Sequence, residues 1–293
     1  MRETGAEKID AQTIARHLIQ EGLPLHGFCP FAAVESHLLP CRAAARLPKS
    51  PRTVIAVLFP YRHPDAGMRN LSRYACVPDY HTAAGGVLRQ TAARLRKEYP
   101  PFCFEPFIDS SPIPEVRAAA LAGLGCVGDN GLLIHPQYGS WVFIGTIVTD
   151  ADIAAMPGMS AAYADGSPPD SWEPPACRHC GACARACPAG CINGGREGCL
   201  SAVTQRKGDL SEEEREMIRA GGLAWGCDRC QEVCPLNRGA KIAPYPCLTP
   251  YEPLLTPAGL AGNLTGRAYG WRGRAVPLRN LELLNGSDEE GDP

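Results

Sequence analysis

The sequence feature that most constrains this chain is a pair of cysteine motifs between residues 177 and 235. The first motif reads CRHCGACARACP, in which four cysteines are spaced C-x2-C-x2-C-x3-C before a proline. The second motif reads CDRCQEVCP, and Cys199 lies between the two. In proteins with two iron–sulfur clusters, the first three thiolates of a C-x2-C-x2-C-x3-C-P run hold one cluster and the fourth ligates the other. Together these cysteines supply eight thiolates, enough for two 4Fe-4S clusters with four ligands each.

This crossing rule divides the cysteines into two predicted ligand sets. The first cluster is expected to take Cys177, Cys180, Cys183 and Cys234, and the second Cys187, Cys199, Cys227 and Cys230. Zinc is the competing metal, because paired CxxC elements also suit tetrahedral sites. Four closely spaced cysteines before a proline favour iron. A disulfide framework is disfavoured, because such scaffolds are short and secreted.

The composition describes an ordinary soluble protein. With 293 residues, the chain can bury a sizeable core as one large domain with an insertion or as two moderate domains. A net charge of -2 gives no overall basic field, so any contact with nucleic acid would have to be local. The N-terminus carries acids, unlike a secretory signal, and the apolar run from Val54 to Phe59 is too short to span a bilayer. We therefore expect a cytoplasmic protein without a membrane partner, in which seven further cysteines are small buried residues or bystanders: Cys29, Cys41, Cys76, Cys103, Cys126, Cys191 and Cys247.

Apolar periodicity predicts helices and strands before the cysteine motifs. Helices are expected over about residues 11–20 and 82–98 and from Asp109 to about Leu124, and strands near residues 25–28, 53–60, 102–108 and 141–148. Residues 152–175 are dense in Pro, Gly, Ser and Ala, which predicts a linker. Ser211 is expected to cap a short helix over residues 211–220, and the acidic end at residues 287–293 is expected to be disordered.

Several motifs together resemble the epoxyqueuosine reductase family. They are RYACVPDYH at residues 73–81, FIDSSP at 107–112, GLGCVGDNGLLIHPQYGSWVFIG at 123–145, GCLSAVTQRKG at 198–208 and GCDRCQEVCPLN at 226–237. The resemblance implies an α/β (α+β) fold. A nitroreductase-like cobalamin-binding domain would cover residues 1–151 and a linker 152–175. A bacterial, ferredoxin-like domain with two 4Fe-4S clusters would cover 176–248, and a C-terminal helical segment with an acidic tail 249–293.

The resemblance also implies a reaction, the reduction of epoxyqueuosine to queuosine in tRNA. Its cofactors would be two 4Fe-4S clusters and base-off cobalamin that cycles between Co(II) and Co(I). Its partners would be tRNA and a low-potential electron donor such as flavodoxin or ferredoxin. Two alternatives stay open: a cobalamin-dependent reductase of another small substrate, and a ferredoxin-like electron-transfer or corrinoid-activating protein.

Asp109 matches the family's catalytic acid, while Tyr80 and His81 match its DYH element near the substrate. An acid that works near neutral pH needs its proton, so we expect burial to raise the pKa of Asp109. The alternative is that Asp109 caps the helix after it. The residues that match the cofactor-binding segments are Ser72, Arg73, Tyr74, Asp109, Gly128, Leu133, Ser140, Ile144, Ser201 and Thr204.

The chain departs from the family pattern in three places. Asp129 stands where the family has a lysine, and RYACV replaces RYARG. Longer members carry a C-terminal helical-repeat domain, whereas only one RNLELL-like helix is expected here. The candidates for contact with tRNA phosphates are Lys207, Arg238, Lys241 and the arginines Arg267, Arg272, Arg274 and Arg279.

Overall fold

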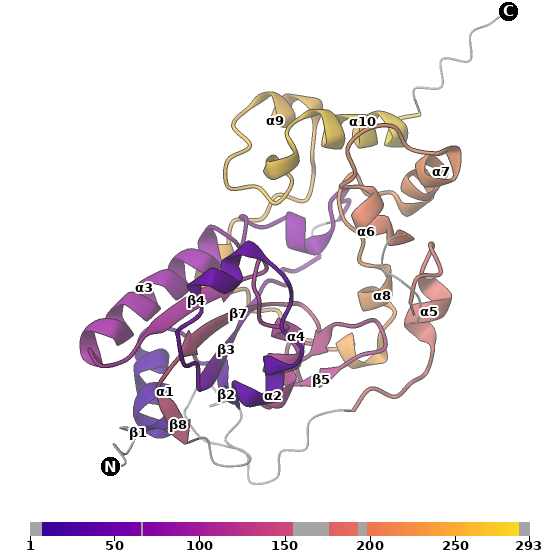
Figure 1. The fold of residues 1–293 in the computed structure, drawn as a ribbon. Helices are drawn as coiled ribbons and strands as arrows, with labels where there is room; N and C mark the ends of the chain where they lie inside the picture. Colours follow the sequence, from indigo (N-terminus) through magenta and orange to yellow (C-terminus); the bar gives the residue numbers. More distant parts are fainter. Residues whose placement is uncertain (1–7, 66, 155–175, 193–197, 287–293) are drawn as a thin grey trace, which may run out of the picture.

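A four-stranded antiparallel sheet forms the centre of the α/β body in the computed structural model, which describes residues 8–65, 67–154, 176–192 and 198–286 (Figure 1). The strand order is β2 (His26–Pro30), β3 (Thr53–Pro60), β7 (Val142–Thr149) and β4 (Phe104–Ile108). Strands β3 and β7 pair along their whole length, from Thr53 with Thr149 to Pro60 with Val142. All residues of β3 are buried, because helices cover both faces of the sheet.

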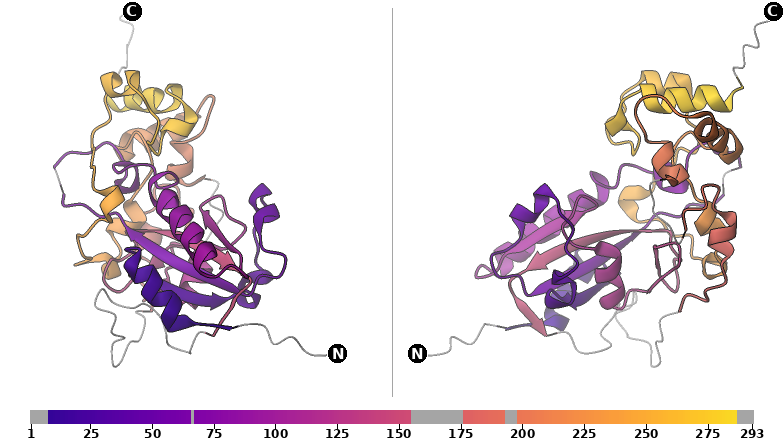
Figure 2. Two further views of the ribbon diagram at one scale, coloured as in Figure 1. Left: turned by 90° about the vertical axis from the view of Figure 1, so that its left-hand side faces the viewer. Right: turned by 45° about the vertical axis from the view of Figure 1, so that its right-hand side comes forward.

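The covering helices form the two outer layers of this body (Figures 1 and 2). On one face, α1 (Ala11–Gln20) and α3 (Ala83–Glu98) pack Ile14 and Leu88 against Phe59 of β3. On the other face, α2 (Ala32–Glu35) and α4 (Glu115–Leu121) pack against Val54 and its neighbours. Gly145 of β7 permits the close approach of α3, because a Cβ atom there would lie 2.2 Å from Leu88 Cδ1.

Two small strand pairs complete the body. Strand β1 (Lys8–Asp10) pairs in parallel with β8 (Asp152–Ala154). Strands β5 (Cys126–Val127) and β6 (Leu133–Ile134) form a hairpin whose loop carries Asp129. This loop faces the cysteine motifs, so it connects the α/β body to the expected cluster sites.

The cysteine motifs lie on short helices and loops beside the sheet. These helices are α5 (Ala182–Ala186), α6 (Leu200–Val203), α7 (Glu212–Gly221) and α8 (Arg229–Glu232). Two further helices, α9 (Pro257–Ala261) and α10 (Ala275–Leu284), lie at the top of Figure 1. Buried Asn280 joins α10 to the cluster region, because its side-chain amide donates to the carbonyls of Thr204 and Ala224 at 2.8 and 2.7 Å. Between these parts the chain returns to the α/β body, where Leu248 joins the α1–α3 core and Tyr245 N donates to Pro60 O at 2.8 Å.

The regular elements confirm most sequence-based expectations. The predicted helix over residues 11–20 and the strand over 53–60 are confirmed residue for residue, and Ser211 forms a capping box with Glu214. The helix expected from Asp109 is wrong in its start, because it begins only at Glu115, beyond the prolines at 112 and 114. Most of the predicted linker and the whole predicted acidic tail lie outside the described residues. Among the described residues, no helix has both the length and the apolar character needed to cross a bilayer.

Candidate cluster and cofactor site

One small cavity is lined by the four cysteines predicted for the first cluster: Cys177, Cys180, Cys183 and Cys234. The left-handed backbone of Gly181, with φ +67°, turns the chain between Cys180 and α5. Helix α5 packs against α8, and this contact brings Cys234 from the second motif to the first. An all-sulfur set of four donors fits an iron–sulfur cluster.

The loop of the β5–β6 hairpin lies against this cavity. Asp129 accepts a hydrogen bond from His179 Nδ1 at 2.7 Å, and both side chains lie near the sulfur of Cys177. The position that departs from the family pattern is therefore at the edge of the first predicted cluster site. Asp129 also lines a second, larger cavity and therefore lies between this cavity and the small one.

The cysteines predicted for the second cluster gather at this larger cavity. Cys199, Cys227 and Cys230 line it, and Cys187 lies behind them, close enough to interact electrostatically with Cys230. Burial and these neighbouring thiols raise the pKa of Cys230 to about 12. Thiols crowded in this way hold their protons until a metal replaces them. The donor set therefore suits a second metal cluster.

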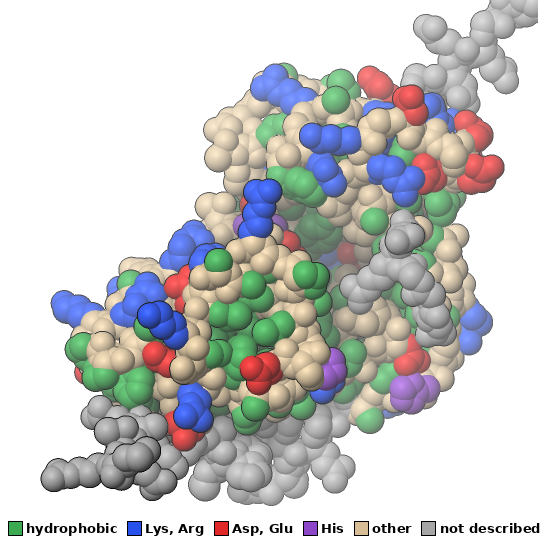
Figure 3. Space-filling view, in the orientation of Figure 1, with side chains coloured by type: hydrophobic (Ala, Val, Ile, Leu, Met, Phe, Trp, Pro, Cys, Tyr) green, Lys and Arg blue, Asp and Glu red, His purple; other side chains and the backbone are tan. Residues whose placement is uncertain are grey.

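The larger cavity has a volume of about 420 Å³ and lies between the α/β body and the cluster region. Figure 3 shows a hollow between these two parts of the molecule. Tyr61, Tyr74, Tyr80 and Phe143 contribute rings to its wall, and the rings of Tyr80 and Phe143 stack with centroids 4.2 Å apart. Aromatic faces on one side and the cluster cysteines on the other fit a large, flat, redox-active cofactor.

A hydrogen-bonded group of acidic residues and one histidine lies next to Tyr80. His81 Nε2 donates to Asp109 Oδ2 at 3.0 Å, and His81 Nδ1 donates to Asp79 Oδ1 at 2.7 Å. The Asp109 backbone is left-handed, with φ +57°, and its N–H donates to Glu115 Oε2 at 3.1 Å. A non-glycine residue in this conformation is strained, and such strain is common at functional sites.

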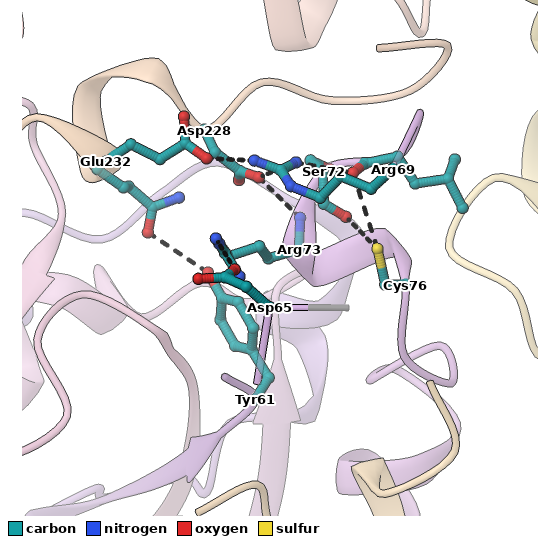
Figure 4. Close-up of polar contacts among 10 residues, drawn as sticks. Tyr61, Asp65, Arg69, Ser72, Arg73, Cys76, Asp228 and Glu232 are labelled. Atoms are coloured by element: carbon teal, nitrogen blue, oxygen red, sulfur yellow. Dashed lines mark hydrogen bonds and ion pairs between the residues drawn. The ribbon is translucent and has the colours of Figure 1, made fainter. Parts of the chain in front are cut away.

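A buried polar network holds helix α8 against residues 69–76 (Figure 4). Asp228 accepts from Arg69 Nη1 at 2.9 Å and from the backbone N–H of Arg73 at 2.8 Å. Tyr61 donates to Gln231 at 3.4 Å, and Arg69 also pairs with Glu232. Because Cys227 and Cys230 flank Asp228 in the chain, this network fixes the position of the second ligand set relative to the sheet.

Comparison with known proteins identifies the family. A family model described as "Epoxyqueuosine reductase QueG, DUF1730" matches residues 42–110, and one described as "4Fe-4S double cluster binding domain" matches residues 176–237. The epoxyqueuosine reductase of Lactococcus garvieae is 33% identical over 243 residues, which cover 76% of this chain and 64% of that protein. That of Listeria monocytogenes is 32% identical over 264 residues, with 80% and 64% covered. The chain belongs to the epoxyqueuosine reductase family.

Solved structures of the epoxyqueuosine reductase family share the fold. The enzyme of Streptococcus thermophilus aligns with a TM-score of 0.70 and 23% identity, covering 93% of this chain and 79% of the other. A structure of an epoxyqueuosine reductase with an epoxyqueuosine-modified tRNA-Tyr stem loop aligns with a TM-score of 0.74 and 21% identity, covering 93% and 80%. Membership of the family and the double-cluster match decide between iron and zinc in favour of iron.

The charge states around Asp109 differ from the expectation drawn from the epoxyqueuosine reductase family. The expected rise in the pKa of Asp109 is wrong, because the hydrogen bond from His81 lowers this pKa and outweighs burial. Burial of the carboxyl raises the pKa of Asp109 and is the second-largest effect, but the charge of His81 and a hydrogen bond from Tyr80 lower it further. Instead, the hydrogen bonds to Asp109 and Asp79 raise the pKa of His81 to about 9, and burial raises that of Glu115 to about 8. Near neutral pH the protons are therefore held by His81 and Glu115.

The geometry also excludes the capping role that was the alternative for Asp109. Pro114 is the N-cap residue of α4, and Asp109 lies five residues earlier. The Asp109 carboxylate instead bonds His81, and the hydroxyl of Tyr80 also hydrogen-bonds it.

The residues that match the cofactor-binding segments divide into two groups. Tyr74, Ser140 and Ser201 line the larger cavity, and Gly128 lines the smaller one. The following residues line neither cavity: Ser72, Arg73, Asp109, Leu133, Ile144 and Thr204. Thr204 is wholly buried, where its hydroxyl donates to Ser201 O and accepts from Gly226 N, both at 2.9 Å, so it stabilises the loop after α6. Ile144 and Leu133 belong to the hydrophobic core on the α4 side of the sheet.

Sequence reasoning missed several residues of the site. Tyr61, Phe143 and Gln231 line the larger cavity, and Glu115 holds the Asp109 amide. No local pattern distinguishes Tyr61 or Phe143 from the core residues beside them in their strands. Glu115 carries a weak signal, because an acid at a helix start is usually read as a favourable partner for the helix dipole.

The residues proposed for tRNA contact do not form one group. Lys241 lies at the α/β body, where its backbone N–H donates to Gln137 O at 2.7 Å, whereas Arg272, Arg274 and Arg279 belong to the segment of α9 and α10 at the top of Figure 1. Figure 3 shows both basic and acidic side chains in this upper part of the molecule. Several of the arginines form hydrogen bonds or ion pairs within the protein. Arg267 pairs with Glu252, Arg274 donates to Gly262 O at 3.0 Å, and Arg279 donates to Gly208 O at 2.7 Å. Arg272 stacks on exposed Trp271, with its guanidinium carbon 3.7 Å from the ring centroid.

Proposed function

We propose that the protein reduces epoxyqueuosine to queuosine in tRNA, with two 4Fe-4S clusters and cobalamin as cofactors. One observation carries this proposal: the larger cavity is lined on one side by Cys199, Cys227 and Cys230 and on the other by Tyr80, beside the His81–Asp109 pair. A source of electrons and a source of protons thus meet at one cavity. Relatives that are more than 30% identical carry this activity in their names.

The residues of the larger cavity fit the role of a cobalamin site. Bound there, cobalamin would supply a strongly reducing, nucleophilic metal centre next to the second cluster. Tyr74, Ser140 and Ser201 would hold its edge through their hydroxyl groups, and the Tyr80–Phe143 stack would border its face.

His81 and Asp109 supply the proton. Reduction of an epoxide to an alkene takes up two electrons and two protons and releases water, so the oxygen must be protonated as it leaves. His81 is held as the imidazolium between Asp79 and Asp109, and the pKa of about 9 keeps it charged at neutral pH. His81 would donate its Nε2 proton to the departing oxygen, directly or through Asp109 Oδ2, and solvent would supply the second proton that completes the water.

The first cluster is the entry point for electrons in this proposal. Cys180 is an exposed cysteine of the first set, whereas the second set lies against the cavity. A low-potential flavodoxin or ferredoxin would dock beside Cys180, and electrons would pass from the first cluster to the second. This route requires the reducing interior of the cell, where free thiols also persist.

The test is an oxygen-free assay on tRNA that contains epoxyqueuosine, followed by nucleoside mass spectrometry. Queuosine should form only when reductant, both clusters and cobalamin are all present. A protein that binds both cofactors and reduces simple epoxides but leaves the tRNA unchanged would support the rival reductase of small substrates. Queuosine formation at an undiminished rate after complete removal of corrinoid would refute the proposal.

A further inference from the structure

A fifth thiol lies beside the second predicted ligand set. Cys191 follows Cys187 by four residues, and their sulfur atoms are 3.5 Å apart. The segment between them, CPAGC, folds back on itself, because Gly190 adopts φ +58° and its N–H donates to Cys187 O at 3.1 Å. This turn places both sulfurs at one position of the site.

Cys191 is the member of this pair that faces the larger cavity. It lines that cavity together with Cys199, Cys227 and Cys230, whereas Cys187 does not. The Cys191 thiol also hydrogen-bonds that of Cys199. The backbone amides of Ala189, Cys191 and Ile192, in turn, hydrogen-bond the Cys187 sulfur, so the turn holds that sulfur in place.

Five thiols therefore surround a site that needs four. We propose that Cys187 and Cys191 are interchangeable ligands to the same iron of the second cluster, so that the cluster survives the loss of either thiol. Three observations support this: Cys191 hydrogen-bonds Cys199 while Cys187 interacts with Cys227 and Cys230, the sulfurs of Cys187 and Cys191 are 3.5 Å apart, and one tight turn carries both. A rotation about χ1 moves a sulfur by a comparable distance, so the exchange needs no rearrangement of the sheet. The inference depends on the cluster content and not on tRNA as substrate.

The test is the iron content of cysteine variants purified without oxygen. The wild type, C187A and C191A should each hold about eight irons per chain, whereas C187A/C191A should hold about four, since only the first cluster remains. C227A is the matched control, because Cys191 hydrogen-bonds Cys187 and Cys199 and no such bond joins it to Cys227 among the described residues; it should also hold about four irons. A drop to about four irons in either single variant would overturn the exchange.

A second measurement follows the protection of the two thiols, first in the wild-type protein and then in a variant whose folding is checked. In the cluster-loaded protein, brief alkylation followed by peptide mass spectrometry should label one of the two thiols, with exposed Cys103 as the positive control. In C187A, whose folding is checked by circular dichroism, Cys191 should become protected. Label on Cys191 in C187A, or protection of both thiols in the wild type, would contradict the proposal.

Discussion

At the scale of single residues, the proton is held by His81 and not by Asp109, the residue that matches the family's catalytic acid. Asp109 accepts from His81 and is therefore an anion, while His81 carries the proton between two carboxylates. In the proposed reaction, Asp109 would therefore act mainly by setting the charge and the direction of the imidazolium. Its left-handed backbone is held by Glu115, which accepts from the Asp109 N–H at 3.1 Å.

The pH dependence of turnover tests the role of His81. Because the pKa of His81 is raised from 6.5 to about 9, the imidazolium persists below that value and is lost as the pH rises through it. The rate on epoxyqueuosine tRNA should therefore fall through about pH 9. H81Q should lower kcat by about a hundredfold and remove this limb of the profile. An unchanged fall near pH 9 in H81Q would assign it to another group.

Glu115 provides a prediction about stability. Its pKa is about 8 in the folded protein and 4.5 when unperturbed, so between these values the folded state holds more protons than the unfolded state. This group therefore makes the free energy of unfolding decrease as the pH rises from about 5 to 8. E115Q keeps an acceptor for the Asp109 amide but cannot ionise, so it should flatten this decrease in denaturation curves.

E115A is the control for that experiment. It removes the acceptor as well and should cost about 1–3 kcal/mol at pH 5, where E115Q costs little, because the Asp109 amide loses its partner. Equal losses for E115Q and E115A at pH 5 would show that the hydrogen bond to Asp109 contributes nothing.

At the scale of elements, the sequence predicts those helices and strands whose limits are set by residues close together in the chain. Strand β3 has a branched apolar run, and α7 has Ser211 and Glu214 at capping distance, so both are readable from a few residues. The start of α4 could not be predicted from a few residues. Asp109-Ser110-Ser111 resembles a helix cap in sequence, but the backbone of Asp109 is left-handed and α4 begins at Glu115. The larger cavity is less predictable still, since Tyr80, Phe143 and Ser201 meet only through the packing of distant segments.

A single substitution tests how much the hydrogen bonds of Asp228, which hold α8 against residues 69–76, contribute to stability. D228A leaves Arg69 and the Arg73 amide without their buried acceptor, so it should lower the free energy of unfolding by about 3 kcal/mol. E232Q removes the half-exposed partner of the same arginine and should cost under about 1 kcal/mol. Thermal unfolding under anaerobic conditions, followed by circular dichroism, measures both. Similar losses for the two variants would contradict a special role for Asp228.

At the scale of the whole molecule, the chain brings two predicted cluster sites together at one cavity. The first ligand set includes exposed Cys180, the second lies against the cavity, and the tyrosines and His81 lie beyond it. The cysteine spacing already predicted the division into two sets, because the crossing rule is a property of the motif. The order in space depends on the return of residues 240–248 to the α/β body and on the Asp228 network, neither of which the spacing contains.

Electron transfer from the clusters into the larger cavity is the central step of the proposed reaction. The most direct measurement reduces the cluster-loaded protein, removes the excess reductant under anaerobic conditions and adds cobalamin while the visible spectrum is recorded. We expect the absorption of the oxidised clusters to recover at the same rate as cobalamin is reduced. Reduced clusters that leave added cobalamin unchanged would contradict this expectation.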